Sequence, residues 1–91
     1  MTIKDAMKTY RLPRRSTPEE LEYHWTKVLT FGNRVLLAGN FYQGVGKPSY
    51  YGAVYEFQSD DRSCEGDIIL KAASEVEFED DGHAIAWAMQ Q

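Results

Sequence analysis

The spacing of apolar residues changes near Gly32, from a helical repeat to the alternation that is typical of β-strands. Before this point, Thr17 is suited to cap a helix, Pro18 favours its first position, and Glu20 completes a capping box. Apolar residues then recur along one helical face, at Leu21, Trp25, Val28 and Leu29. The pattern predicts a helix from residue 18 to about residue 30.

A competing interpretation ends this helix near Thr26. Gly32 and Asn33 separate two apolar runs, KVLTF at 27–31 and RVLLA at 34–38. A Gly-Asn pair between two such runs is a hairpin signal. A hairpin over residues 27–38 is therefore the alternative.

Four segments after Gly32 are predicted as strands. Residues 34–43 and 49–58 alternate, and the second of these segments has an aromatic-rich face made of Tyr51, Ala53, Tyr55 and Phe57. DIILKAA at 67–73 is typical of a buried strand, and SEVEFED at 74–80 alternates cleanly. The connection near Ala72–Ser74 lacks a turn signal, so a helical turn or a bulged strand stays open for residues 68–75.

Short helices are predicted at both ends, at residues 2–10 and 81–91. The prediction is thus a single α+β domain over residues 1–91, with two N-terminal helices, a four-stranded antiparallel sheet and a short C-terminal helix. The helices are expected to cover one face of the sheet and not both.

Composition indicates the cellular environment in which the protein is expected. The chain has 91 residues and a single cysteine, which excludes an internal disulfide. Its mean hydropathy is −0.52, and no apolar run approaches the roughly 20 residues of a membrane span. The first 15 residues contain no apolar signal-peptide core. We expect a cytoplasmic protein that does not contact a membrane.

Charge is unevenly distributed along the chain. Residues 1–50 carry eight basic and four acidic residues, a balance of +4, whereas residues 51–91 carry two basic and ten acidic residues, a balance of −8. Such asymmetry is typical of proteins with an electrostatically directed partner, and it also arises when the two halves neutralise each other on folding.

Neither an enzyme nor a metalloprotein is expected. Glu20 and His24 are four residues apart, but one cysteine and two histidines do not make a zinc site, and acidic neighbours do not activate Cys64. GVGKPS at 44–49 lacks the first glycine and the hydroxyl residue of a phosphate-binding loop. No catalytic residue, metal site or cofactor is predicted.

The strand predicted at 74–80 would carry an acidic stripe. Glu75, Glu77 and Glu79 would lie on one face at intervals of about 6.7 Å, twice the strand rise. Asp80 and Asp81 would continue the row. Charges on an edge strand often only prevent aggregation, but such a stripe would also fit a basic, nucleic-acid-binding groove on another protein.

Two tyrosines, Tyr42 and Tyr50, fall on the second face of the sheet and flank the glycine-rich loop. Exposed tyrosines are typical of protein-binding surfaces, so they are candidate partner contacts, including contacts in a homodimer.

The preferred hypothesis is a small non-catalytic protein-binding module. It would inhibit a nucleic-acid-handling host protein, in the manner of phage or mobile-element anti-defence proteins such as anti-CRISPR proteins, by occupying a basic surface. The first alternative is a nucleic-acid binder that uses Arg11, Arg14, Arg15 and the exposed tyrosines. The second alternative is a small-molecule binder beneath the Gly44–Pro48 loop.

Overall fold

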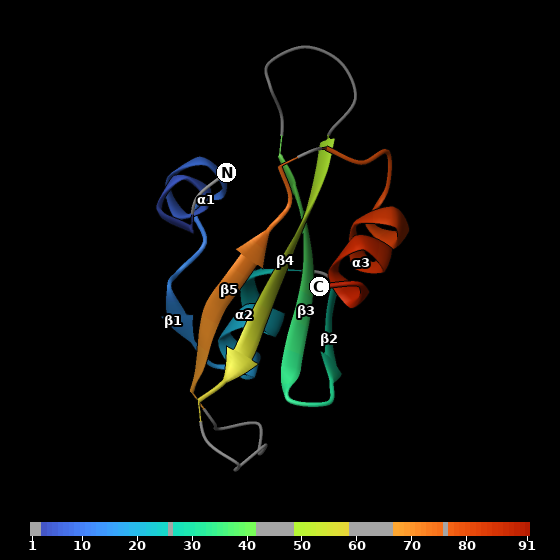
Figure 1. The fold of residues 1–91 in the computed structure, drawn as a ribbon. Coiled ribbons are helices and arrows are strands. Elements are labelled where there is room, and N and C mark those ends of the chain that lie inside the picture. The colour runs from blue at the N-terminus through green and yellow to red at the C-terminus, as the bar shows by residue number, and fades with distance from the viewer. Residues whose placement is uncertain (1–2, 26, 42–48, 59–66, 76) are drawn as a thin grey trace.

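A five-stranded antiparallel sheet with helices on both faces forms the protein, within the part of the chain that the computed structural model describes (Figure 1). The described residues are 3–25, 27–41, 49–58, 67–75 and 77–91. In chain order the elements are α1 (Ile3–Tyr10), β1 (Arg15–Ser16), α2 (Pro18–His24), β2 (Lys27–Phe31), β3 (Arg34–Phe41), β4 (Ser49–Phe57), β5 (Ile68–Ala73) and α3 (Asp81–Met89). The α+β class is confirmed, with five strands where four were predicted.

Helix α2 begins as predicted and ends early. The Thr17 hydroxyl oxygen accepts a hydrogen bond from the Glu20 backbone N–H at 3.3 Å, and Pro18 begins the helix. The helix stops at His24, and Trp25 is already extended. The predicted helix to about residue 30 is therefore wrong in its second half.

The competing hairpin is the observed structure. Strands β2 and β3 pair from Lys27↔Ala38 to Phe31↔Arg34 across a turn at Gly32, whose φ of 64° suits glycine. The backbone of β2 pairs with its neighbour in the sheet, whereas its side chains gain little burial: Leu29 is 44% exposed and Phe31 is 59% exposed. Pairing with β3, and not burial of a helical stripe, decides this segment.

The order of the strands in the sheet is β1-β5-β4-β3-β2, and every neighbouring pair is antiparallel. Strand β5 confirms the bulged alternative for this part of the chain. Ala72 pairs with Val54 and Leu70 pairs with Tyr55, so Lys71 is an extra residue in β5.

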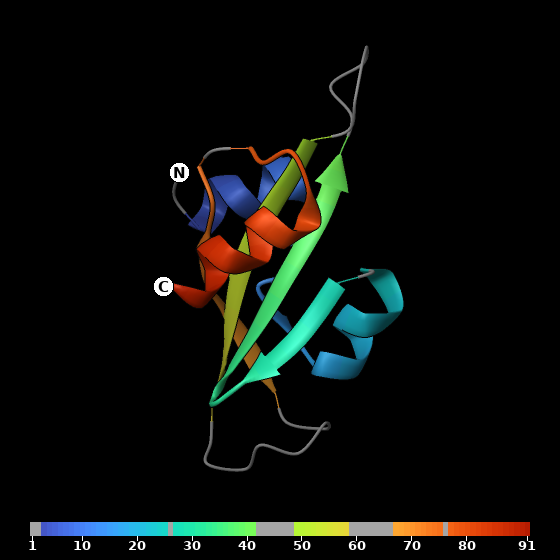
Figure 2. The ribbon, with the colours of Figure 1, turned by 90° about the vertical axis from the view of Figure 1, so that its right-hand side faces the viewer.

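Helices cover both faces of the sheet, contrary to the expectation of one covered face (Figures 1 and 2). On the first face, Tyr51, Tyr55 and their neighbours pack against residues of α1 and α2. On the second face, Leu36, Ala38 and Val54 pack against Ala84, Ile85 and Ala88 of α3. The alternation predicted for β4 is confirmed, because each face of the strand fills its own core.

The segment after β5 is a connection and not the predicted acidic strand. The Ser74 backbone N–H donates to Gly52 O at 2.9 Å, and the Ser74 side-chain oxygen accepts from Gly52 N–H at 3.0 Å. Beyond Ser74, the described residues pair with the sheet only through an isolated bridge between Phe78 and Tyr50. The chain then turns into α3, so the side-chain spacing of a strand does not apply to this segment.

Candidate functional site

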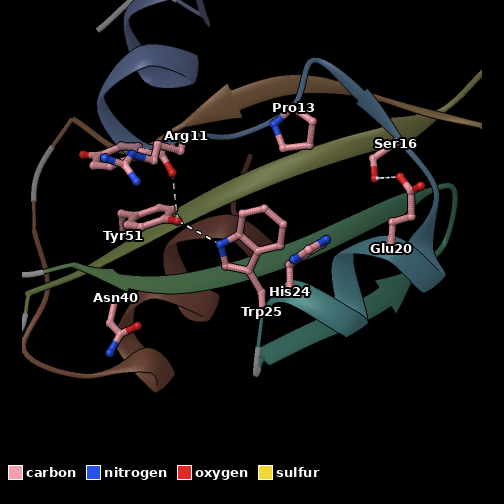
Figure 3. A pocket seen from close by; sticks show the side chains of 9 residues that line it. Arg11, Pro13, Ser16, Glu20, His24, Trp25, Asn40 and Tyr51 are labelled. Atoms are coloured by element: carbon pink, nitrogen blue, oxygen red, sulfur yellow. Dashed lines mark hydrogen bonds between the residues drawn. The ribbon is translucent and has the colours of Figure 1, made fainter.

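A cavity of about 550 Å³ lies on the first face of the sheet, where the segment after α1 passes the end of α2 (Figure 3). We call it the Trp25 pocket. It is lined by Tyr10, Arg11, Pro13, Ser16, Glu20, His24, Trp25, Asn40 and Tyr51.

Hydrogen bonds fix the aromatic wall of the Trp25 pocket. The Trp25 indole N–H donates to the Tyr51 hydroxyl oxygen at 2.9 Å, and the Tyr51 hydroxyl donates to Tyr10 O at 3.4 Å (Figure 3). The rings of Tyr10 and Tyr51 stack with centroids 4.0 Å apart. The indole is half-buried, so part of its apolar surface faces the cavity while its polar atom is satisfied.

The tyrosines of this wall are held in their neutral form. Burial raises the pKa of Tyr51, and the hydrogen bond from Trp25 offsets part of that rise. Burial likewise raises the pKa of Tyr10 and of Tyr55, whose hydroxyl donates to Pro13 O at 2.5 Å. A neutral hydroxyl can donate and accept at once, as the bond pattern requires.

Arg11 lines the pocket and has an unusual backbone conformation. Its φ is +57°, directly after the last residue of α1. Glycine is the usual residue at this left-handed position after a helix, because a side chain is strained there. The guanidinium is exposed, and it brings a positive charge to an otherwise aromatic wall.

Polar groups line the rest of the pocket. The Ser16 hydroxyl, in a residue only 5% exposed, donates to Glu20 Oε2 at 3.1 Å. His24, one helical turn after Glu20, and Asn40 from β3 are both exposed. No group of three or more His, Cys, Asp or Glu residues that could hold a metal ion occurs among the described residues.

The structure separates the three predicted arginines. Arg11 lines the pocket, whereas Arg14 and Arg15 lie on the segment that pairs with β5. The carbonyl oxygen of Arg14 accepts from Leu70 N–H at 2.8 Å, and Arg15 pairs with Ile69. Both side chains are exposed at this edge of the sheet.

The tyrosine surface is only partly described. Tyr50 is half-buried against the second core and hydrogen-bonds Phe78 through the backbone, so it is not the exposed tyrosine that was expected. Tyr42 and the Gly44–Pro48 loop lie outside the described residues, as does Cys64.

The predicted acidic residues fall into two groups. Glu75, Glu77 and Glu79 are exposed on the connection after β5. Asp80 caps α3, where its Oδ1 accepts from His83 N–H at 2.8 Å, and Asp81 is the first residue of that helix. The backbone hydrogen bond from His83 lowers the pKa of Asp80. The acidic stripe is therefore not the regular row that was predicted.

Six residues of the pocket were not predicted as part of any site: Tyr10, Pro13, Ser16, Trp25, Asn40 and Tyr51. Trp25 and Tyr51 were assigned to the apolar core, and their polar atoms meet only across 26 residues of sequence. Two sequence signals do point to the pocket: Arg11, predicted as a possible nucleic-acid contact, and the spacing of Glu20 and His24.

Over residues 12–91, the chain matches the family described as Nucleotide modification associated domain 4. The chain belongs to this family. The match includes most of the Trp25 pocket and begins just after Tyr10 and Arg11. The comparisons with curated proteins and with solved structures gave no match.

A smaller cavity, of about 340 Å³, lies on the second face of the sheet. Arg34 and Glu56 line it, with Arg34 Nε and Glu56 Oε2 4.0 Å apart.

No helix in the described part of the chain is long and apolar enough to cross a membrane.

Proposed function

We propose that the protein is a non-catalytic nucleotide-binding module of a nucleotide-modification system, and that the Trp25 pocket holds the nucleotide. The family description supplies the link to nucleotide modification. The pocket supplies the chemistry, because nucleobases stack on aromatic side chains and phosphates bind guanidinium groups.

The observation that carries the proposal is the position of Arg11 beside the aromatic wall. A left-handed backbone conformation at a residue other than glycine is a pointer to function. Here the strained residue brings a phosphate-binding group to the cavity that Trp25 lines. A base against the indole and its phosphate on the guanidinium would use both groups.

The polar rim supports the same ligand. The Glu20 carboxylate accepts hydrogen bonds and the Asn40 amide both donates and accepts, which are the groups that read base edges. The expectation of a non-catalytic protein is kept as part of the proposal.

Inhibition of a nucleic-acid-handling protein through an acidic stripe has less support. Glu75, Glu77 and Glu79 do not lie in a strand, and Asp80 caps a helix. In the described part of the segment after β5, a basic protein partner therefore has no regular acidic row to bind. Binding of a nucleotide needs only the pocket.

Tryptophan fluorescence tests the proposal. The chain has two tryptophans, Trp25 in the pocket and Trp87 in the second core, on the other face of the sheet. We would titrate the protein with nucleoside monophosphates, triphosphates and short oligonucleotides. At least one class should change the emission of the wild type and leave that of Trp25→Phe unchanged. No response to any of the three classes from the folded wild type would overturn the proposal.

A further inference from the structure

We infer that the ligand of the Trp25 pocket is a phosphodiester-linked nucleotide within a single strand, and not a free nucleotide. This inference rests on the proposed function, since it assumes that the pocket binds a nucleotide at all. DNA and RNA share the chemistry, namely a base beside a singly charged phosphodiester.

The charge of the pocket favours a phosphodiester. Arg11 is the one Lys or Arg side chain among the described residues that line it, and Glu20 brings a carboxylate to the same cavity. A phosphodiester carries a single negative charge, which one guanidinium matches. A free triphosphate carries several charges and is usually held by converging cations or a metal ion, and the described residues form no metal cluster.

The shape of the pocket favours a base outside a duplex. Trp25 is half-buried within a concave cavity on the first face, with His24 edge-on to it at a centroid distance of 5.8 Å. A base stacked in a duplex cannot enter such a cavity, whereas an unpaired base can stack on the indole. The cavity of about 550 Å³ is in the size range of sites for small ligands.

The protein segment next to the pocket offers a path for the nucleic-acid strand. From Arg11, the segment passes Pro13, which lines the pocket, to Arg14 and then to β1 at the edge of the sheet. Hydrogen bonding to Leu70 fixes the backbone of Arg14. We therefore assign Arg11 to the phosphate of the bound nucleotide and Arg14 to a neighbouring phosphate.

Arg15 provides a matched control. It is exposed and carries the same charge, but Ser16 is buried on the first face and residues alternate along a strand. The side chain of Arg15 thus starts from the face opposite the pocket. Arg15→Gln therefore removes the same charge without removing a contact to the bound nucleic-acid strand.

The experiment is a competition assay with a fluorescently labelled oligothymidylate, repeated with oligouridylate. Unlabelled oligonucleotide should compete at a concentration at least about tenfold below that of thymidine triphosphate, because neighbouring phosphates add contacts. In Arg11→Gln and in Arg14→Gln, the slope of log affinity against log salt should each fall by about 0.7. Arg15→Gln should keep the wild-type slope. A preference for one of the two oligonucleotides identifies DNA or RNA as the source of the strand.

Each failure has its own meaning. If thymidine triphosphate competes as well as the oligonucleotide, the pocket is still a nucleotide site and the single-strand inference is overturned. If all three arginine variants lose the same slope, the attraction is diffuse and the assigned contacts are wrong. If neither the oligonucleotides nor the triphosphate bind the folded protein, the single-strand inference is overturned, and the proposed function fails as well when thymidine monophosphate does not bind either.

Discussion

The rings of Tyr10 and Tyr51 stack in parallel, with centroids 4.0 Å and planes 3° apart. This contact joins the end of α1 to the middle of the sheet. It also places the Tyr51 hydroxyl where it accepts from Trp25 and donates to Tyr10 O. One tyrosine therefore supports both the fold and the wall of the pocket.

Removing that hydroxyl should destabilise the protein. Tyr51→Phe leaves the stacked ring in place but takes away the acceptor of the half-buried indole N–H, at a cost of about 1 kcal/mol in the free energy of unfolding. Urea denaturation measures this loss. Tyr23→Phe is the control, because Tyr23 is 87% exposed and should lose nothing. Equal stability of Tyr51→Phe and wild type would contradict the assigned hydrogen bonds.

Glycines on opposite faces of the sheet should have separable effects. A Cβ at Gly39 would overlap the Tyr51 hydroxyl and lie 2.9 Å from Trp25 Cδ1, so Gly39→Ala should disturb the pocket. A Cβ at Gly52 would lie 2.7 Å from Ala84 O, so Gly52→Ala should displace α3. Thermal melting should show that both variants are less stable than wild type.

Tryptophan emission separates the two glycine variants. Paired with a Trp87→Phe background, Gly39→Ala should alter the Trp25 spectrum more than Gly52→Ala does. The reverse order would mean that the two cores are not independent.

Arg11→Gly should make the protein more stable and weaken nucleotide binding. Glycine relieves the strain of the left-handed backbone conformation, which is worth about 1–2 kcal/mol. The greater freedom of glycine in the unfolded chain cancels about 0.5–1 kcal/mol of this gain. A small rise in melting temperature is expected. Arg14→Gly is the control: Arg14 is not among the residues with positive φ, so glycine there should lower the melting temperature. A fall in stability of Arg11→Gly would show that its conformation is not strained.

Asp80 should act as the cap of α3. Asp80→Ala removes the acceptor of His83 N–H and should lower the melting temperature, whereas Asp80→Asn keeps an acceptor and should stay close to wild type at neutral pH. Because the pKa of Asp80 is lowered in the folded protein, its contribution is present above the ordinary carboxyl pKa and is lost as pH falls through the folded value. Melting at a series of acidic pH values tests this, and an unchanged acid profile in Asp80→Ala would contradict it.

Alkaline pH should unfold the protein through its buried tyrosines. The pKa values of Tyr10, Tyr51 and Tyr55 are raised above the ordinary value of 10.0, chiefly by burial. The unfolded chain therefore loses these protons first, so stability is full below pH 10 and falls as pH rises above it. Tyrosinate absorbance followed together with circular dichroism should show that these residues ionise on unfolding. In Tyr55→Phe the decline with pH should be shallower.

The sequence by itself determined the local elements whose signals lie within a few residues. The capping box begins α2 at Pro18, the Gly-Asn pair turns the hairpin at Gly32, and the alternation in β4 assigns Tyr51 and Val54 to opposite faces. These features depend on backbone geometry and side-chain direction, which neighbouring residues fix. The α+β class follows from them.

Tertiary structure decided which local structure is adopted by segments whose sequence fits two. Residues 27–31 have a helical stripe and also a strand pattern, and pairing with β3 selects the strand. Residues 74–80 alternate like a strand, yet the two hydrogen bonds between Ser74 and Gly52 and the capping of α3 by Asp80 make them a connection. The Trp25 pocket also depends on tertiary structure, because its indole meets the Tyr51 hydroxyl only after the sheet has brought distant segments together. Long-range contacts of this sort leave no local period in a sequence, and here they built the candidate site.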